Sequence, residues 1–326
     1  MGEESLKASI IVLTYRKFDN LEQNIQSILK QSCSNYEVIV SDDGSPNFDR
    51  AYIESLFQKM PDHDRRLSII TREKNVGTVK NFNAAIQAAT GDLIIPLSQD
   101  DCFYDDHVLA QVIDAFSDPK ANICLGRRTI DRTDQMLPNS TQLGIMRDGP
   151  QKKLWFRNAC SNLYYGATLY YRKEYLQNAG LFDESYTLLE DYPFAMRCIE
   201  KGEDIRIIDA PTIRYSASGV SSGKKQAKPS PIMNNDFLKM YEQNYLTSKE
   251  RLNSIVCRKY LQYRMRKKDP NCSRLAIYGN VIVDIILFLA KREAARTKKN
   301  YIDCRFERLW KFEELATKIR LKKSLS

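Results

Sequence analysis

Short apolar runs alternate with segments of helical period through about the first two hundred residues. The runs have the length of a buried strand, and in the segments between them apolar residues recur every three or four positions. This alternation is typical of a mostly parallel sheet with helices on its faces, so we predict an α/β fold. The predicted strands are residues 8–13, 36–40, 67–70, 93–97, 205–208 and 212–215. The first predicted helix is residues 20–30. A second has Val79, Phe82, Ile86 and Ala89 on its apolar face, and a third has Phe194, Cys198 and Ile199.

Polar clusters follow three of the predicted strands at their carboxyl ends. They are SDDGSP at residues 41–46, EKNVG at residues 73–77 and SQDD at residues 98–101. Open α/β sheets bind ligands in the crevice outside the carboxyl ends of their strands. Each loop is a weak signal alone, but together they predict one ligand site at this edge of the sheet.

Residues 219–231 are rich in Gly, Ser, Lys and Pro, which predicts a linker between two domains, placed at residues 223–233. Residues 1–222 would form the α/β domain. Residues 234–326 would form a helical extension, because aromatic and aliphatic residues repeat every three or four positions among basic ones. Its predicted helices are residues 234–263, 275–299 and 305–323.

The basic charge of the chain is concentrated in its C-terminal quarter. Residues 241–326 hold 21 Lys and Arg against 9 Asp and Glu, whereas residues 1–240 hold 29 against 32. A basic segment favours an anionic partner, either a membrane surface or nucleic acid. We expect no nucleic acid, because no recognisable nucleic-acid-binding motif accompanies the charge. The candidate membrane patches are Arg264, Arg266, Lys267 and Lys268, then Lys298 and Lys299, and Lys322 and Lys323.

A second interpretation of this basic segment is structural. The same side chains could be solvated faces of helices that pack on the α/β domain or form a homo-oligomer. The eight cysteines are widely scattered without a C-x-x-C pair, and no signal-peptide pattern opens the chain. The best apolar stretch, residues 275–290, is shorter than a membrane span and carries Asp284. We therefore expect a cytoplasmic protein, peripheral on the inner face of the cell membrane.

Asp100 and Asp101 are the leading candidates for chemistry. Adjacent carboxylates at a strand end repel each other unless a cation or hydrogen bonds compensate. A hard divalent ion held by one or two carboxylates and by substrate phosphates suits such a pair. The alternative is that Asp101 caps the next helix. Asp43 in the DDGS loop has its own alternative, a turn that closes a strand.

The chain resembles the inverting nucleotide-sugar glycosyltransferases of family 2, which have the GT-A fold. The resemblance covers residues 9–222 and is carried by the segments ASIIVLTYRK, QSILKQS, YEVIVSDDGS, NVGTVKNFNAAIQAATGDLIIPLSQDD, AGLFDESYTLLEDYPFAMRCIEKG and RYSASGVSS. Residues 75–101 are similar to the branch that makes bacterial surface polysaccharides such as capsules. The resemblance implies a nucleotide-sugar half at about residues 1–101 and an acceptor half at about residues 102–222.

By this resemblance the first half of the chain would bind a UDP-sugar. Tyr15 would lie against the nucleobase, Asp43 would accept the uracil N3 proton, and Lys80 would add positive charge near the phosphates. Asp101 would bind Mn²⁺ or Mg²⁺, and Asp100 would contact the ribose or share the metal. The full set of expected donor-binding residues is Thr14, Tyr15, Asp43, Asn75, Gly77, Lys80 and Asp100.

The resemblance also implies that Asp191 is the general base that removes the proton of the acceptor hydroxyl. A carboxylate suits this role because it need only hydrogen-bond the hydroxyl as the nucleophile forms. Glu190, Tyr165 and Arg214 are the acceptor-side candidates. The acceptor would be a growing surface polysaccharide or a lipid-linked oligosaccharide.

The alternative functions are a catalytically silent scaffold that docks through its basic helices and a nucleotidyltransferase. The nucleotidyltransferase is disfavoured because no Gly-rich basic loop follows the first strand.

The chain departs from the family pattern at three positions. Ser98 replaces the first acid of D-x-D, Phe82 replaces an Arg near the diphosphate, and Ser218 lies where many members carry a His.

Overall fold

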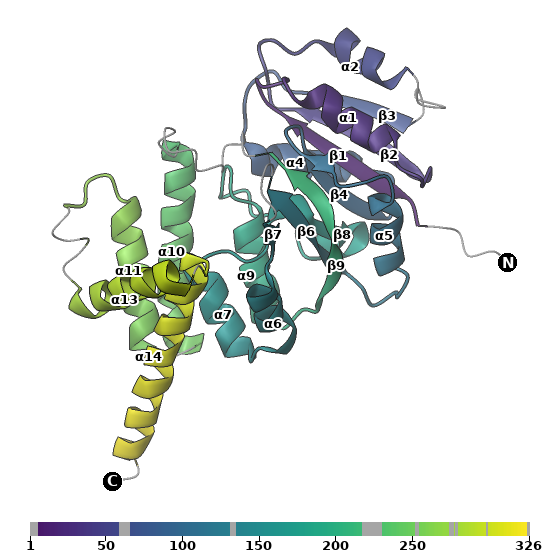
Figure 1. Cartoon of the computed structure of the whole chain (residues 1–326). Coiled ribbons are helices and arrows are strands. Elements are labelled where there is room, and N and C mark those ends of the chain that lie inside the picture. Colours follow the sequence, from purple (N-terminus) through teal and green to yellow (C-terminus); the bar gives the residue numbers. More distant parts are fainter. Residues whose placement is uncertain are drawn as a thin grey trace. The chain divides into compact units, whose positions relative to one another are not determined.

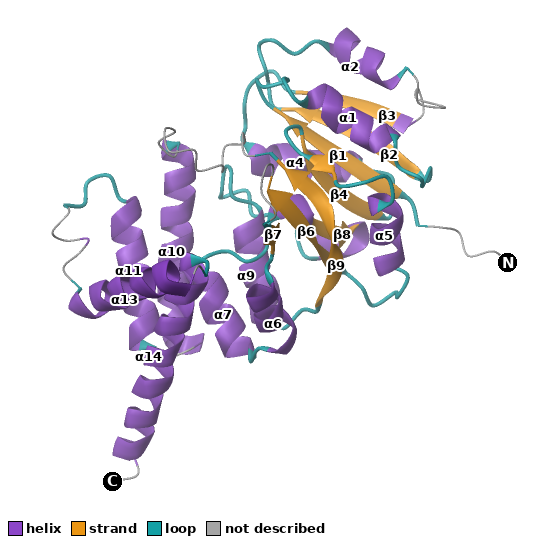
Figure 2. Cartoon of the chain, viewed as in Figure 1, coloured by secondary structure: helices purple, strands orange, loops and turns teal. Residues whose placement is uncertain are grey.

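The computed structural model describes residues 6–58, 66–130, 135–216, 230–251, 254–273, 277, 280–297 and 299–324. Contacts between residues divide the chain into two compact units. The sheet unit comprises Met1–Pro138, Tyr164–Cys198 and Glu203–Ser230, and the helical unit comprises Asn139–Leu163, Ile199–Gly202 and Pro231–Ser326. Every strand of the described chain belongs to the sheet unit (Figures 1 and 2).

One mixed sheet forms the sheet unit, in the order β3-β2-β1-β4-β8-β6-β9-β5, with β7 paired to β6. Strands β3, β2, β1 and β4 are parallel, and so are β6 and β9, whereas β8 runs antiparallel to β4 and β6. The strands are β1 Ala8–Thr14, β2 Tyr36–Asp42, β3 Leu67–Thr71, β4 Leu93–Ser98, β5 Cys102–Phe103, β6 Ile123–Ile130, β7 Met136–Leu137, β8 Leu169–Arg172 and β9 Ile205–Tyr215.

The predicted α/β class and the first four predicted strands are confirmed. The prediction of separate strands at residues 205–208 and 212–215 is wrong, because β9 is continuous. Pro211 lies opposite Arg127, between two register shifts of the β6–β9 pair, and such an irregularity lets a proline stay in a strand. The helices that accompany the sheet are α1 Leu21–Leu29, α2 Arg50–Phe57, α4 Thr78–Ala88, α5 Val108–Ala115, α8 Lys173–Asn178 and α9 Asp191–Lys201.

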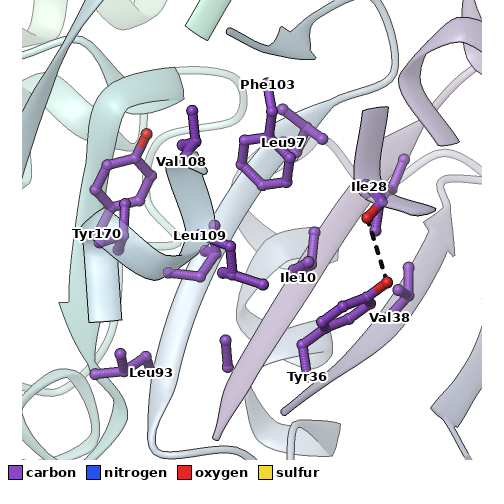
Figure 3. Packing of buried hydrophobic residues seen from close by; sticks show 14 of the residues in the cluster. Ile10, Ile28, Tyr36, Val38, Leu93, Leu97, Phe103, Val108, Leu109 and Tyr170 are labelled. Atoms are coloured by element: carbon purple, nitrogen blue, oxygen red, sulfur yellow. Dashed lines mark hydrogen bonds between the residues drawn. The ribbon is translucent and has the colours of Figure 1, made fainter. Parts of the chain in front are cut away.

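The core of the sheet unit is continuous through the parallel strands. Ile10, Ile11 and Val12 of β1 are all inaccessible to solvent, although successive side chains of a strand point to opposite faces. Both faces of β1 are therefore covered, as in other parallel sheets. Figure 3 shows part of this core, in which the Tyr36 hydroxyl donates to the carbonyl oxygen of Ile28 at 3.2 Å.

The helical unit is built from α6 Ser140–Asp148, α7 Gln151–Cys160, α10 Pro231–Arg251, α11 Ile255–Lys268, α13 Val281–Thr297 and α14 Tyr301–Ser324. The single helix predicted for residues 234–263 is wrong, because α11 starts anew with Ser254 as its N-cap. The Ser254 hydroxyl accepts the Cys257 N–H at 2.9 Å. None of the helices in the described ranges has the length and apolarity that crossing a membrane requires.

The two compact units do not coincide with the predicted domains. The helical unit includes Asn139–Leu163 as well as the C-terminal helices, and Asp303 of α14 accepts hydrogen bonds from Asn139 and Gln142. Asp303 also pairs with the buried Arg157 at 3.4 Å. The division into domains at residues 223–233 stays a prediction, because most of that segment lies outside the described residues.

Candidate functional site

Asp42 ends β2 and organises the loop that follows it. Its carboxylate accepts the Thr14 hydroxyl at 3.0 Å and the Ser45 N–H at 2.7 Å. Thr14 and Asp42 face each other in the parallel register of β1 and β2, and both are buried. The Thr14 side chain, predicted to bind the donor, therefore ties the two strand ends together.

Asp43 binds the loop at residues 75–77. Its carboxylate accepts hydrogen bonds from the Asn75 side chain at 2.8 Å, the Val76 N–H at 2.8 Å and the Gly77 N–H at 2.9 Å. Burial raises the pKa of Asp43, and the Val76 and Gly77 N–H groups oppose this rise. The structure thus brings Asp43, Asn75 and Gly77 together, as one rigid edge of the site.

Glycine is required where this loop meets its neighbours. Gly77 has a φ of +94°, and a Cβ there would lie 2.5 Å from the Thr187 side chain. Val79, in the first turn of α4, donates its N–H to the Thr187 carbonyl at 3.1 Å. The start of α4 therefore packs against the segment that leads to Asp191.

Tyr15 and Lys80, both predicted to bind the donor, lie in two different parts of the sheet unit. The Tyr15 N–H donates to the Gln99 side chain at 3.3 Å, which holds Tyr15 next to the SQDD loop. The Arg16 guanidinium lies over its ring, 4.9 Å from the centroid. Lys80 is exposed on α4, and its carbonyl accepts a hydrogen bond from Arg72.

Asp101 is buried at the end of β4. Its carboxylate accepts the Ser216 N–H at 2.9 Å, and its carbonyl accepts the Asn24 side chain at 2.7 Å. Burial raises the pKa of Asp101 to about 7, although the Ser216 N–H and Arg128 oppose the rise. A buried carboxyl group with so high a pKa is one that a bound cation would stabilise in its charged form.

Asp100 lines a polar cavity of about 760 Å³. Burial also raises its pKa, against the positive charge of Lys17. Arg214 lines the same cavity and lies over the Tyr104 ring at 5.1 Å. Arg214, predicted on the acceptor side, is thus placed beside Asp100.

Asp100 lines the cavity, and its negative charge contributes to the raised pKa of the buried Asp101, so a divalent cation ligated by these carboxylates and by substrate phosphates would relieve their repulsion. Such a cation needs only one or two protein carboxylates. Through the ranges that the structure describes, no cluster of three or more His, Cys, Asp or Glu residues forms a closed protein cage. A cation held here would therefore bind together with a phosphate ligand.

Arg128 is a site residue that the sequence analysis missed. Its guanidinium lies between two aromatic rings, 3.8 Å from the Tyr165 centroid and 4.1 Å from the Tyr215 centroid. We call Arg128, Tyr165 and Tyr215 the Arg128 stack. Its positive charge lowers the pKa of Asp101, which places it beside the acidic strand end.

Asp191 and Glu190 lie against Gly166, the residue after Tyr165. The Gly166 N–H donates to the Asp191 carboxylate at 2.9 Å, and a Cβ on Gly166 would lie 2.8 Å from Glu190 Oε1. Tyr171 is fully buried nearby, and burial followed by the charges of Asp191 and Glu190 raises its pKa. The Asp191 carboxylate is thus oriented by a backbone N–H at the edge of the Arg128 stack.

Backbone neighbours connect the Arg128 stack to both acids, because Ser216, which donates its N–H to Asp101, follows Tyr215, and Gly166, which donates its N–H to Asp191, follows Tyr165. The positive charge of Arg128 can neutralise an anionic leaving group, and the Asp191 carboxylate can accept a proton.

The structure also describes two of the positions that depart from the family pattern. Ser98 is exposed, and Phe82 is buried against the Phe182 ring at 5.0 Å, whereas Ser218 lies outside the described residues.

The sequence profile of Glycosyl transferase family 2 matches residues 9–177. An uncharacterized Sinorhizobium fredii protein, y4gI, is 27% identical over 64% of this chain and 22% of its own length. The uncharacterized glycosyltransferase EpsJ of Bacillus subtilis is 25% identical over 78% of this chain and 75% of its own length. The chain thus spans about a fifth of y4gI but most of EpsJ.

Solved structures share the fold. S. aureus TarS 1-349 in complex with UDP-GlcNAc has a TM-score of 0.58 at 17% identity, over 95% of this chain and 92% of that one. The mannosyltransferase PcManGT of Pyrobaculum calidifontis, in complex with GDP-Man and Mn²⁺, has a TM-score of 0.55 at 15% identity, over 95% and 88%. The expected GT-A-like fold is confirmed. The chain belongs to glycosyl transferase family 2.

Proposed function

We propose that this protein is an inverting, metal-dependent glycosyltransferase that uses a UDP-sugar. Its acceptor is a hydroxyl of a growing surface polysaccharide or of a lipid-linked oligosaccharide. The observation that supports the proposal is that the Arg128 stack neighbours both acids: Arg128 lowers the pKa of Asp101, and Gly166, which follows Tyr165, donates its N–H to Asp191. The UDP-GlcNAc complex of TarS supports the choice of donor.

The donor occupies the edge formed by Tyr15, Asp43 and the loop at residues 75–77. Tyr15 contacts the nucleobase, and Asp43, with both oxygens already fixed by three donors, accepts a hydrogen bond from the uracil N3–H. Asp100 and Asp101 would hold Mn²⁺ or Mg²⁺, which would supply positive charge to neutralise the leaving diphosphate. The Mn²⁺ in the PcManGT complex supports this cofactor.

Arg128 adds a fixed positive charge at the diphosphate. Two tyrosine rings restrict its guanidinium, so little reorganisation is needed when the leaving group becomes more negative. Asp191 accepts the proton of the acceptor hydroxyl while that oxygen attacks the anomeric carbon in line. The Gly166 N–H keeps the Asp191 carboxylate oriented for this step.

Replacing Asp191 by Asn tests this function. We expect Asp191→Asn to release UDP from UDP-sugars about a hundredfold to ten-thousandfold more slowly, because the amide cannot act as the base. Its affinity for UDP should be unchanged, since Asp191 lies on the acceptor side. The assay measures UDP release from a panel of UDP-sugars, with an envelope glycan fraction as acceptor.

Asp114→Asn is the matched control, because Asp114 is exposed on α5. This control should retain full turnover. Equal turnover by Asp191→Asn and the wild type would remove Asp191 from the reaction. Binding of UDP without turnover by the wild type on any donor would favour the scaffold alternative.

A further inference from the structure

The outer face of α13 carries large apolar side chains that are open to solvent. Val281 is 69% exposed, Ile285 48% and Phe288 59%. They are spaced by four and three residues, so they share one face of the helix. Arg292 and Arg296 continue the same face toward the C-terminus. We call Val281, Ile285, Phe288, Arg292 and Arg296 the α13 stripe.

The opposite face of α13 is already used for packing. Val283, Ile286 and Ala290 are at most 1% exposed and belong to the core of the helical unit. Glu293 pairs with Arg308 of α14 at 2.7 Å, which further fixes the orientation of α13. The apolar part of the α13 stripe is therefore a second apolar face that its own unit leaves open.

The charge along the α13 stripe selects the partner. Lys291 flanks the stripe and is exposed, as are Arg292 and Arg296. Of the two acids of the helix, Glu293 is paired with Arg308, whereas Asp284 is half-buried and lies one turn from Val281 and Phe288, so the three exposed cations outnumber the acids beside the stripe. Arg292 lies over the Phe288 ring at 5.7 Å, so the apolar and cationic parts are contiguous. Exposed apolar side chains beside an excess of cations are typical of helices that lie in the plane of an anionic membrane surface.

The basic cluster of α11 does not compete for this role. Arg264 donates to the Cys160 carbonyl at 2.6 Å and lies over the Tyr241 ring, and Lys268 donates to Asn234 at 3.1 Å. Burial and then the charge of Arg264 lower the pKa of Lys267 and Lys268. These three contacts lie within the helical unit.

We propose that α13 docks on an anionic lipid leaflet through the α13 stripe, with the helix axis parallel to the surface. Ile285 and Phe288 insert among the lipid chains, and Arg292 and Arg296 contact the phosphate headgroups. Because α13 has 17 residues and does not qualify as a span, it lies on the leaflet without crossing it. This inference does not depend on the proposed catalytic activity.

Vesicle sedimentation tests the proposal with the full chain. Vesicles of phosphatidylcholine alone are compared with vesicles that also contain phosphatidylglycerol. We expect the wild type to bind the anionic vesicles more tightly. Ile285→Ser combined with Phe288→Ser should weaken that binding by at least about tenfold, because two inserted apolar side chains are lost. Arg292→Gln combined with Arg296→Gln should weaken it by about fivefold per cation, only on anionic vesicles.

Leu315→Ser combined with Ile319→Ser is the matched control, since these α14 residues are 54% and 49% exposed and one turn apart. The control should bind as the wild type does. Unchanged binding by the α13 variants, or an equal loss by the α14 control, would overturn the assignment. The molar mass in solution distinguishes a second copy of the chain as occupant. The membrane proposal would be overturned if the wild type forms a dimer and does not bind vesicles, and if only the Ile285→Ser, Phe288→Ser double variant dissociates that dimer.

Discussion

Arg128 gives the site a fixed cation that requires no metal. The two tyrosine rings of the Arg128 stack hold a planar, delocalised guanidinium, which an ammonium group would not replace. Ser98 offers no carboxylate at the position where the family pattern has its first acid. An arginine charge beside Asp101 would therefore supplement the proposed cation site from the protein itself.

Arg128→Gln should weaken UDP binding by about tenfold to a hundredfold, because a charge-assisted contact to the diphosphate is lost. Binding of uridine, which has no phosphate, should be unchanged. Calorimetric titration with each ligand measures both affinities. Arg127→Gln is the control, since Arg127 pairs with the exposed Asp209 at 2.9 Å. An equal loss for uridine and UDP would mean that Arg128 supports the fold and not the diphosphate.

The place of a residue in the site could be predicted from the sequence only where its neighbours lie close by along the chain. Asp43 and Asp101 stand directly after apolar runs, so their place at the strand ends could be inferred. Arg128 meets rings from residues 165 and 215, and Asp101 meets the Ser216 N–H. The contact with Tyr215 comes from the pairing of β6 with β9, and the Ser216 N–H reaches Asp101 where β9 pairs with β5. None of these contacts has a local signature in the sequence.

At the scale of elements, Glu37 joins the amino ends of β1, β2 and β4. It is 7% exposed and accepts hydrogen bonds from the Ser9 hydroxyl at 2.6 Å, the Thr90 N–H at 2.6 Å and the Gly91 N–H at 3.2 Å. Burial alone would raise the pKa of Glu37, but hydrogen bonds from Ser9, Thr90 and Lys7 outweigh it and lower the pKa to about 2. The charged carboxylate therefore stabilises the folded sheet.

The stabilisation by Glu37 should depend on pH in a defined direction. Its folded pKa of about 2 lies below the ordinary value of 4.5, so the contribution is full above pH 4.5 and is lost as the pH falls toward 2. Glu37→Gln should lower the free energy of unfolding by about 3 kcal/mol at neutral pH. Below pH 4.5 the free energy of unfolding should decrease less steeply in this variant than in the wild type. Urea unfolding at several pH values measures both.

Glu54→Gln is the control for Glu37, because Glu54 is exposed on α2 and its ion pair with Arg50 spans 3.7 Å. It should change the free energy of unfolding by less than about 0.5 kcal/mol. Parallel acid profiles for Glu37→Gln and the wild type would contradict the role given to Glu37.

Strands and helices could be predicted where a single short segment carries the apolar run or the helical spacing by itself. The strands of the parallel half and α4 follow from apolar runs and helical spacing, and their boundaries agree within two residues. The segment from residue 120 to 185 lacked a regular pattern. It contains β6 and β8 as well as α6 and α7, which the contacts assign to two units. The buried Arg157 and the aromatic residues of α7 obscure its helical period.

At the scale of the whole molecule, a family 2 sheet unit is joined to a basic helical unit. The excess of positive charge in the C-terminal quarter could be counted from the sequence, but its distribution over the helices could not. Part of the charge packs inside the helical unit around Arg264, and part lies on the outer face of α13. The direction of each side chain decides between these uses.

The central claim is that the edge formed by Tyr15, Asp43, Asp100 and Asp101 binds a UDP-sugar together with a divalent cation. Calorimetric titration of the full chain with UDP, with and without Mn²⁺, tests it most directly when repeated on Asp101→Ala. We predict that Mn²⁺ tightens UDP binding at least about tenfold in the wild type, because Asp101 and the phosphates would both supply oxygen ligands to the cation. Asp101→Ala should abolish that gain. Equal UDP affinity in the presence and absence of Mn²⁺, or a gain that survives Asp101→Ala, would contradict the claim.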